Sequence, residues 1–337
     1  MTIRFGFAGF RHSHAYGLYK QVAGMDGIVV AGACEEDEAA REEAVRNGVE
    51  ITHANLEELL AETPCDVIAI GDYFARRGSL AIRALAAGKH VLVDKPLCTG
   101  LDELDEIDRL SREKGFKVGC MLTMRDMPQI IGVRELIRAG TIGDVQAISF
   151  GGQHPLNRGT RPAWFFEPGK HGGTINDIAI HAVDCIPWVT GLEFSLVKCA
   201  RCWNAYVPDA PYFKDGAQMM LTMNNGCGVL GDVSYFMPSP AGYSLPYYWR
   251  MTFFGSRGLI ETSAGARETT LALFGAQGTE SRPLPEGVPG GYLRSFLKDI
   301  RGEVEEGALD TEEVLRATRV ALTVQRAADE NAHDVKL

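Results

Sequence analysis

The sequence predicts an α/β protein with an N-terminal doubly wound parallel sheet and a C-terminal α+β domain that has a large open, mostly antiparallel sheet. Three observations lead to this prediction. In the first 122 residues, short apolar runs alternate with helical patterns, which is typical of a parallel sheet covered on both faces. Later strand-like runs are joined by Gly and Asn-Gly turns, as in antiparallel sheets. The 337 residues suffice for two domains, which we expect over 1–122 and 123–337.

The first half contains short apolar runs and helical patterns in regular alternation. The predicted strands are Ile3–Phe7, Ile28–Ala33, Asp66–Ile70, His90–Val93 and Lys117–Leu122. The predicted helices are Asp37–Asn47, Ser79–Ala87 and Leu101–Lys114, and glycine follows the last two, as is common at helix ends. Because each helix can connect two parallel strands, this half is predicted to have the nucleotide-binding type of architecture.

The second half has a different pattern. It begins with a predicted helix, a strand, a long loop rich in glycine and aromatic residues, and a second helix, which cover Pro128–Ala139, Val145–Phe150, Gly151–Gly173 and Ile175–Thr190. Strand-like runs then dominate from Leu196 to Phe274, and an Ala-rich helix is predicted over Thr311–Asn331. This pattern favours one large open sheet with a few helices.

The charge of the chain limits its partners. The formal net charge is −10, from 34 basic and 44 acidic side chains. Nucleic acids and anionic membranes need a basic surface, so neither is an expected partner. No apolar run reaches the ~18–20 residues of a membrane span, and the first residues are typical of a strand rather than an export signal. We therefore expect a cytoplasmic protein that acts on a small molecule.

Eight cysteines are scattered through the chain, mostly within apolar runs. In the cytoplasm we expect them to be reduced thiols. Cys199 and Cys202 have the spacing of a metal or redox pair, but residues three apart on a strand point to opposite faces. We expect no metal site.

A loop that contains glycine, Gly6–His14, follows the first predicted strand. A dinucleotide site of the G-x-G-x-x-G type needs a tight turn and a close approach of the backbone to the diphosphate. Gly9 can provide the turn, but Arg11 and His14 occupy the other two glycine positions. Glu35 follows the second strand, where an acid can bind the adenosine ribose and favours NAD. Arg11 could instead pair with the 2′-phosphate of NADP, and a loop that binds no dinucleotide is the alternative.

Lys95 lies in the segment Asp94-Lys95-Pro96, directly after a predicted strand. Ligands bind at the carboxyl ends of strands in such sheets. Lys95 can therefore donate to a substrate oxygen and stabilise a developing alkoxide. A solvated lysine is the alternative.

Three polar residues, Asp177, His181 and Asp184, form one stripe on an otherwise apolar helix that follows two glycines. Histidine titrates near neutral pH and suits acid–base catalysis. Asp177 can hold the substrate or orient the imidazole. A structural hydrogen-bonded cluster is the alternative.

An aromatic segment that contains Arg161 and Trp164 precedes this helix. Arg161 could pair with an anionic substrate and Trp164 could stack on a sugar, although a loop held by packed aromatic residues explains both equally well. Arg76 and Arg77 could bind an acid substrate or a cofactor, or they could be solvated charges at a helix start.

In this order, the strand-and-loop start, AGKHVLVDKPL and GGTINDIAIHAVD resemble the Gfo/Idh/MocA oxidoreductase family, and the closing helix is similar too. The resemblance implies an N-terminal NAD(P)-binding Rossmann domain and a C-terminal open sheet. It implies a dehydrogenase that transfers hydride between NAD(P) and a secondary hydroxyl of a sugar, inositol or related polyol or sugar acid. It also implies a homo-oligomer, a dimer or tetramer, built through the open sheet.

The resemblance, taken with the residues above, gives a set of site residues. The catalytic residues are expected to be Lys95, Asp177 and His181. The cofactor, NAD or else NADP, is expected to contact Gly9, Phe10, Arg11, His12, Glu35, Gly71, Asp94 and Lys95. The substrate is expected to contact Arg125, Arg161, Trp164, Asn176 and Asp184.

The chain also departs from the family pattern. Asp94 replaces a glutamate, Ala179 replaces a glycine, and the first loop has lost two glycines. Two other functions therefore stay open: a non-redox hydrolase or lyase on the same scaffold, and a non-catalytic regulator that binds a nucleotide or sugar.

Overall fold

The computed structural model describes residues 2–337. The chain forms two compact units. Unit 1 consists of the chain up to Met121 together with residues 162–172 and 293–318, and unit 2 consists of residues 122–161, 173–292 and 319–337. The two later segments of unit 1 lie in the part of the sequence that we expected to form the C-terminal domain.

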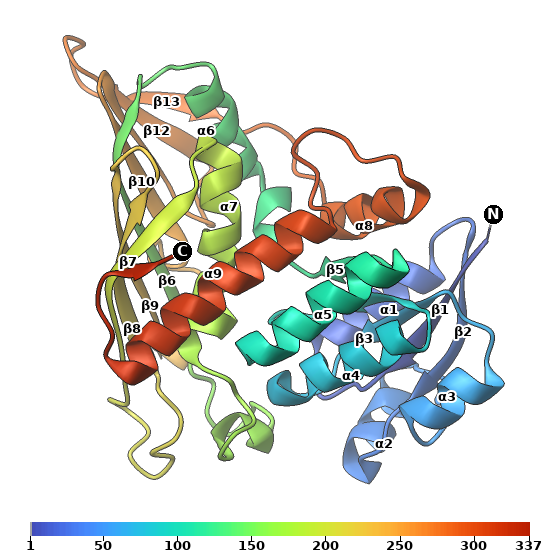
Figure 1. Ribbon diagram of the computed structural model, residues 1–337. Helices are drawn as coiled ribbons and strands as arrows, with labels where there is room; N and C mark the ends of the chain where they lie inside the picture. Colours follow the sequence, from blue (N-terminus) through green and yellow to red (C-terminus); the bar gives the residue numbers. More distant parts are fainter. Residues whose placement is uncertain (1) are drawn as a thin grey trace. The chain divides into compact units, whose positions relative to one another are not determined.

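Unit 1 is built on a five-stranded parallel sheet with the order β2-β1-β3-β4-β5 (Figure 1). Its strands are β1 (Ile3–Ala8), β2 (Ile28–Cys34), β3 (Val67–Ile70), β4 (His90–Val93) and β5 (Val118–Cys120). Its helices include α1 (His14–Ala23), α2 (Glu38–Arg46), α3 (Leu56–Glu62), α4 (Phe74–Ala86) and α5 (Leu101–Lys114). The chain leaves β1 in one direction and reaches β3 in the other, so ligands are expected at the carboxyl ends of these two strands.

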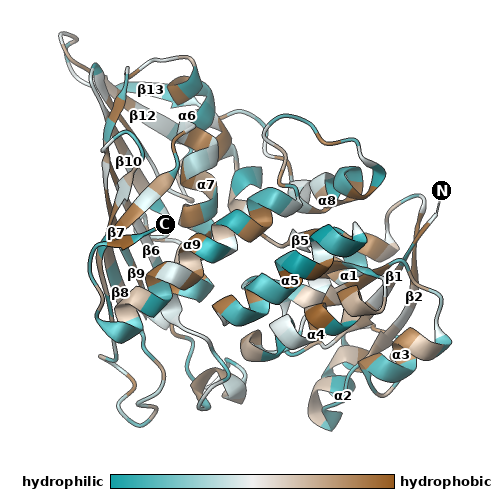
Figure 2. Ribbon diagram, in the orientation of Figure 1, coloured by the Kyte–Doolittle hydropathy of each residue, from teal (hydrophilic) through white to brown (hydrophobic). Residues whose placement is uncertain are grey.

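Helices α4 and α5 pack against each other in unit 1. Figure 2 shows hydrophobic residues on α4 and mainly hydrophilic ones on the visible side of α5. Gly78 of α4 allows this contact, because a Cβ at that position would collide with the carboxylate of Glu103 on α5. The helix begins at Phe74, before the predicted start at Ser79, since Phe74 and Arg77 are both buried.

Unit 2 is built on a nine-stranded sheet with the order β13-β12-β11-β10-β6-β9-β8-β7-β14. Neighbouring strands are antiparallel except for the parallel pair β6 and β9. The strands are β6 (Val145–Pro155), β7 (Phe194–Trp203), β8 (Gly216–Met223), β9 (Gly228–Met237), β10 (Arg250–Gly255), β11 (Gly258–Thr262), β12 (Glu268–Leu273), β13 (Glu280–Pro283) and β14 (Val335–Lys336). The prediction of a large, mostly antiparallel sheet is confirmed.

Helices α6 (Pro128–Arg138) and α7 (Ile180–Thr190) lie on one face of the large sheet (Figure 1). A π-helical turn, η3 (Ile175–Ala179), leads directly into α7. Helices α8 (Gly291–Arg301) and α9 (Thr311–Glu330) contribute residues to both units. The other described segments of helix are the short turns η1 (Thr123–Asp126), η2 (Ala163–Phe166) and η4 (Ser239–Ala241).

Several elements differ from the sequence prediction. Strand β6 continues to Pro155, because residues that were expected to form a loop pair with β9. Helix α3 was missed, although Asn55 caps it by accepting a hydrogen bond from the Glu58 N–H, a local signal that the sequence carries. Strand β13 and helix α8 were also missed.

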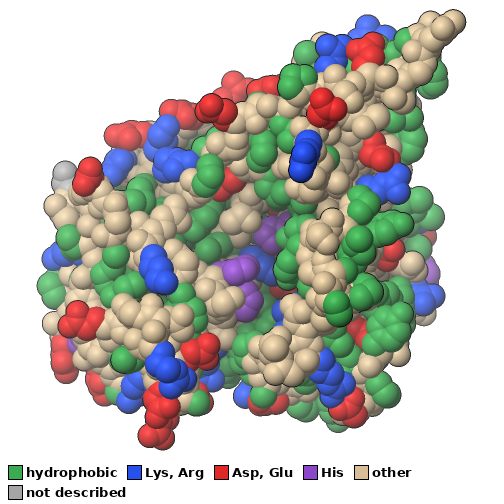
Figure 3. All heavy atoms as spheres, turned by 180° about the vertical axis from the view of Figure 1, so that it is seen from behind, with side chains coloured by type: hydrophobic (Ala, Val, Ile, Leu, Met, Phe, Trp, Pro, Cys, Tyr) green, Lys and Arg blue, Asp and Glu red, His purple; other side chains and the backbone are tan. Residues whose placement is uncertain are grey.

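The surface agrees with the charge balance. On the face drawn in Figure 3, basic side chains are interspersed with acidic ones. None of the helices in residues 2–337 is long and apolar enough to cross a bilayer.

Candidate functional site

The loop after β1 makes the tight turn expected at Gly9. Gly9 has a φ of +82°, and its N–H donates to the carbonyl of Cys34. A Cβ at this position would lie 2.8 Å from the Cβ of Asp72, so the loop packs directly against the chain that follows β3. Helix α1 then begins at His14 with no acidic residue in its first turn, which suits an anion at the helix N-terminus. These features fit the diphosphate of a dinucleotide.

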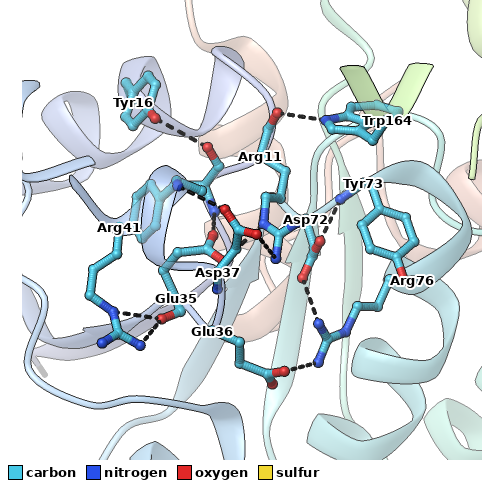
Figure 4. A network of polar contacts seen from close by, with 12 residues as sticks. Arg11, Tyr16, Glu35, Glu36, Asp37, Arg41, Asp72, Tyr73, Arg76 and Trp164 are labelled. Carbon is cyan, nitrogen blue, oxygen red and sulfur yellow. Dashed lines mark hydrogen bonds and ion pairs between the residues drawn. The ribbon is translucent and has the colours of Figure 1, made fainter. Parts of the chain in front are cut away.

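Glu35 lies at the end of β2, as predicted, but its carboxylate already has three donors. It accepts hydrogen bonds from the Phe10 N–H at 2.7 Å, from Arg11 Nε at 2.9 Å and from the Asp37 N–H at 2.9 Å (Figure 4). Its side chain is 0% exposed. Glu35 therefore fastens the loop to β2, and its contact with a ribose stays a prediction.

Three arginines, Arg11, Arg41 and Arg76, and two exposed acids lie around Glu35 (Figure 4), and Arg41 donates to the backbone carbonyl of Glu35. Arg11 Nη2 lies 3.8 Å from Asp37 Oδ2, and Arg76 Nη2 lies 2.5 Å from Glu36 Oε2. Arg76 Nη1 also lies 3.6 Å from the buried carboxylate of Asp72. Arg76 is therefore part of this network and not a solvated charge at a helix start, and its contact with a substrate or cofactor stays a prediction.

Asp94 lies at the carboxyl end of β4 and holds three cationic or imidazole groups. Arg77 Nη2 is 2.8 Å from Oδ2, while the Nδ1 atoms of His12 and His14 are 2.7 and 2.9 Å from Oδ2 and Oδ1. Burial raises the pKa of Asp94, but Arg77, His14 and His12 together lower it well below its ordinary value. The carboxylate is therefore ionised at neutral pH and fixes the loop that replaces the usual glycines.

Burial lowers the pKa of His12 to about 4, although Asp94 opposes this effect. A neutral His12 can donate Nδ1–H to Asp94. His12, His14 and Asp94 also lie close enough together to hold a metal ion. However, the guanidinium of Arg77 already neutralises this carboxylate, which disfavours a second cation.

Arg77 is buried, with 0% of its side chain exposed, so it is not a solvated charge at a helix start. Besides its bond to Asp94, it donates to the backbone carbonyls of Asp72, Asp94 and Lys95. This arginine joins the ends of β3 and β4. No local pattern predicts this role, because the two strand ends are brought together only in the folded sheet.

Lys95 follows β4, as predicted, and is 7% exposed. Its ammonium lies 5.7 Å from the ring centre of Phe74. Arg77 donates a hydrogen bond to the backbone carbonyl of Lys95. The backbone around Lys95 is therefore fixed, as a donor that meets a substrate oxygen requires.

Trp164 is 5% exposed and belongs to unit 1. Its Nε1–H donates to the carbonyl of Arg11 at 3.1 Å, and its ring packs on Phe74 and Phe165. The structure thus places it against the first loop, and its contact with a substrate stays a prediction.

Gly71, in the loop after β3, packs against Ala15 of α1, where a Cβ would not fit.

In unit 2, Asp177 lies on the π-helical turn before α7 and is 3% exposed. Such turns recur at functional sites. The hydroxyl of Tyr235, on β9, donates a hydrogen bond to Asp177 Oδ2. Tyr235 was missed in the sequence, since it lies 58 residues away on a strand of ordinary pattern. The neighbouring Asn176 is buried, and its N–H donates to Gln325 at 3.4 Å.

His181 is half-buried near the start of α7, and its ring centre lies 5.7 Å from that of Trp249. The third residue of the predicted stripe, Asp184, forms an ion pair with Arg125. Nη2 and Nε of Arg125 lie 2.6 and 3.0 Å from the carboxylate oxygens of Asp184. Arg125 and Asp184 are 7% and 1% exposed. Their contact with a substrate stays a prediction.

Arg161 is close to Tyr235 but holds its own loop. Its Nε and Nη2 donate to the carbonyls of Leu156 and Pro155 at 2.7 and 2.9 Å. Its guanidinium carbon lies 4.9 Å from the centre of the Tyr235 ring. The predicted pairing with an anionic substrate would compete with these bonds.

Aromatic rings surround His154 of β6. The ring centres of Tyr248, Tyr243 and Trp249 lie 5.2, 5.7 and 5.8 Å from that of His154. Trp249 has a φ of +50°, which is uncommon outside glycine and recurs at functional sites. Gly152 makes room for it, since a Cβ there would lie 2.8 Å from the Trp249 ring.

Comparison with known proteins identifies both parts of the chain. Residues 3–121 match an oxidoreductase family with an NAD-binding Rossmann fold, and residues 130–261 match the GFO/IDH/MocA C-terminal domain. The levoglucosan dehydrogenase of Pseudarthrobacter phenanthrenivorans is 27% identical over 238 residues, which cover 68% of this chain and 59% of that protein. The scyllo-inositol 2-dehydrogenase (NAD(+)) of Bacillus subtilis is 26% identical over 285 residues, which cover 83% of this chain and 78% of that protein.

Other matches vary in length. The chain spans 46% of an uncharacterized oxidoreductase from Synechocystis, with 30% identity over 174 residues, which are 50% of this chain. Two solved structures share the fold. An inositol dehydrogenase homolog from Azotobacter vinelandii, complexed with NAD+, has a TM-score of 0.82 and 17% identity over 100% of this chain and 98% of that one. An aldose-aldose oxidoreductase from Caulobacter crescentus has a TM-score of 0.78 and 18% identity, with 100% of both chains covered. Since matches to both domains span most of its length, the chain belongs to the Gfo/Idh/MocA oxidoreductases, a family with an NAD-binding Rossmann fold.

Proposed function

We propose that this protein is an NAD-dependent dehydrogenase that oxidises a secondary hydroxyl of a cyclic polyol or sugar. The observation that supports this best is the arrangement in unit 2, where Tyr235 fixes the carboxylate of Asp177 on a π-helical turn just before His181. A fixed acid beside a half-buried imidazole suits proton removal from a bound hydroxyl. The dehydrogenases of levoglucosan and scyllo-inositol among the relatives act on substrates of this class.

Three residues of this chain have separate roles in the proposed reaction. NAD, when bound, supplies the hydride acceptor. His181 takes the proton of the hydroxyl, and Asp177 orients the imidazole or holds a second hydroxyl of the substrate. Lys95 donates to a substrate oxygen and stabilises the negative charge that develops on it. In unit 1, Gly9, Phe10, Arg11, His12, Gly71 and Asp94 belong to the loops that would hold the cofactor.

The substrate class is proposed from an aromatic cluster that begins next to His181. Trp249 contacts His181, and Trp249, Tyr248 and Tyr243 surround His154. Sites for small molecules combine such apolar faces with a few polar groups that fix orientation. A cyclic polyol or a pyranose has apolar C–H faces and a rim of hydroxyls, so it complements this set better than a linear acid does.

Two further parts of the proposal concern the setting of the enzyme. The eight cysteines are all free, which supports a reducing compartment such as the cytoplasm. The uncovered face of the large sheet carries exposed apolar side chains, which supports a homo-oligomer built through that face.

Steady-state kinetics of substituted enzymes test the catalytic roles. The assay follows NADH formation with a panel of cyclic polyols and sugars that includes scyllo-inositol and levoglucosan. We expect His181→Ala to lower turnover by about 10²–10⁴-fold, because the proton acceptor is lost. Lys95→Ala should also lower turnover, because the developing alkoxide loses a charged donor.

The exposed His333 provides a matched control, since His333→Ala removes an imidazole far from Asp177 in the chain. Melting temperatures of all variants verify folding. Full activity of His181→Ala or of Lys95→Ala would contradict the role proposed for that residue.

A further inference from the structure

The π-helical turn η3, which carries Asp177, begins with two buried backbone N–H groups. The first N–H groups of a helix have no acceptor within the helix, so they need one from elsewhere. Ile175 and Asn176 are both 0% exposed, which keeps water from their N–H groups. The hydroxyl of Thr174, at the N-cap position, donates to the carbonyl of Lys214. The start of η3 therefore depends on another part of the chain.

Gln325 of α9 supplies the acceptor. Its Oε1 accepts from the Ile175 N–H at 3.0 Å and from the Asn176 N–H at 3.4 Å. Its Nε2 donates to Asp329 Oδ1 at 3.0 Å and to Cys202 Sγ at 3.6 Å. Gln325 is 6% exposed. Backbone donors face one end of the amide and acceptors face the other, so this position needs a side chain with one acceptor end and one donor end.

Gly173 brings the same amide into contact with the backbone that holds Asp177. Gly173 has a φ of +102°, and a Cβ at this position would collide with Cδ and Oε1 of Gln325. The carbonyl of Gly173 accepts a hydrogen bond from the Asp177 N–H at 3.0 Å. The contact accounts for the second of the two glycines that precede the helix in the sequence.

Asp177 is thus held at both its backbone and its side chain. Tyr235 donates to the carboxylate from β9, while Gln325 and Gly173 fix the turn from the other end. All four residues belong to unit 2. His181 follows in α7, directly after η3, so a shift of the turn would displace the acid relative to the imidazole.

We propose that Gln325 is a positioning residue of the dehydrogenase, which holds Asp177 where it can serve His181 in removing the proton of the substrate hydroxyl. The proposal rests on the proposed function, since it assumes that these two side chains act on a bound hydroxyl. Gln325 acts through η3 and needs no contact with substrate or cofactor. A small displacement of a catalytic group lowers turnover even when its cause lies away from the reacting atoms.

The first test compares two substitutions of Gln325. Gln325→Met keeps the approximate size and removes both polar ends, so kcat should fall by about 10–100-fold. The KM for NAD should change by no more than about 2-fold, because the loops that would hold the cofactor lie in unit 1. Thr323→Val, at a position on the same helix that is 8% exposed, is the matched control and should keep wild-type kcat.

Gln325→Glu/Asp329→Asn exchanges the donor and the acceptor between the two side chains. The introduced carboxylate can accept from both backbone N–H groups and from the introduced amide. We expect kcat to recover to within about 3-fold of the wild type. Gln325→Glu alone should have a lower kcat, because it places a second carboxylate beside Asp329. A residue that only fills space would give no such recovery.

Hydrogen exchange provides a readout that does not depend on activity. Loss of the acceptor should speed exchange of the Ile175 and Asn176 amides in Gln325→Met, while β8 and β9 keep their wild-type rates. Gln325→Glu/Asp329→Asn should restore the slow exchange. Melting temperatures of all variants are measured alongside.

The outcomes separate this inference from the proposed function. A wild type that oxidises none of the polyols and sugars would contradict the proposed dehydrogenase, while exchange at Ile175 and Asn176 would still show whether Gln325 holds the turn. Unchanged exchange in Gln325→Met would overturn the inference, and so would wild-type kcat despite faster exchange. If Gln325→Met does not fold, an equal kcat in Gln325→Glu and Gln325→Glu/Asp329→Asn would overturn it instead.

Discussion

Arg77 and Asp94 form a buried ion pair in unit 1, with 2.8 Å between Nη2 and Oδ2 and no more than 1% of either side chain exposed. The same guanidinium binds the carbonyls of Asp72, Asp94 and Lys95. One side chain therefore satisfies the polar groups at the carboxyl ends of two strands. This arrangement holds the backbone of Lys95 in position, and Lys95 is the residue that we propose to contact the substrate oxygen.

Arg77→Ala should destabilise the protein strongly. The substitution leaves the carboxylate of Asp94 buried without its main cation, and breaking such a pair costs about 3–5 kcal/mol in the free energy of unfolding. Urea unfolding monitored by circular dichroism measures the loss. Arg83→Ala on the same helix is the control, because Arg83 is 39% exposed and should cost less than about 1 kcal/mol. Equal losses in the two variants would show that the buried pair has no special role.

Tyr235→Phe should impair catalysis more than folding. The variant keeps the ring beneath Arg161 and removes only the hydroxyl that donates to Asp177. Hydrogen bonds to charged groups contribute about 1.5–3 kcal/mol, so kcat/KM should fall by about 10–100-fold. The NADH dissociation constant should not change.

Tyr206→Phe is the matched control for this prediction, since Tyr206 is 64% exposed and lies in the same unit. Melting temperature and kcat/KM are measured for both variants. If Tyr235→Phe lowers the melting temperature but keeps wild-type kcat/KM, Tyr235 is a packing residue and does not position Asp177.

His12 should make the stability of the protein depend on pH in the acid range. Burial holds its pKa at about 4 in the folded protein, against about 6.5 in the unfolded chain. Between these values the unfolded chain binds more protons, so stability rises with pH from about 4 to 6.5 and is lost on acidification. The shift corresponds to at most about 3 kcal/mol. Asp94 adds to the loss on acidification only at lower pH, because its folded pKa lies well below its ordinary value.

Melting temperatures between pH 4.5 and 7.5 test this dependence on pH. His12→Gln should flatten the profile, because the titrating group is removed from its contacts with Asp94, His14 and Arg77. His333→Gln, at an exposed position, serves as the control. Parallel profiles for the wild type and His12→Gln would contradict the prediction.

The uncovered face of the large sheet should join two copies of the chain. Leu230 of β9, Met220 of β8 and Phe254 of β10 are 55%, 44% and 42% exposed on this sheet. Light scattering at micromolar concentration should show a dimer or tetramer, and Met220→Lys/Leu230→Lys should shift it to the monomer because charges are buried at the contact. A monomeric wild type would contradict the proposed oligomer.

The sequence alone predicts those features that neighbouring residues encode. Alternation of apolar runs and helical patterns predicts the parallel sheet of unit 1, because strands covered on both faces must be apolar throughout. The position of Lys95 directly after β4 is predicted in the same way, since a motif at the end of a strand needs only the strand to be recognised. Asp177 and His181 are likewise found from their helix, although the π-helical turn at Asp177 is not.

The tertiary structure decides which distant groups meet. Tyr235 binds Asp177 from a strand 58 residues away, and Arg77 binds the ends of two strands that are separate in sequence. The parallel pairing of β6 with β9 and the inclusion of residues 162–172 in unit 1 are of the same kind. Periodicity reports which side of an element is buried, but not against which partner it is buried. Such partners are fixed only when the whole chain packs its apolar surface and pairs its buried polar groups at once.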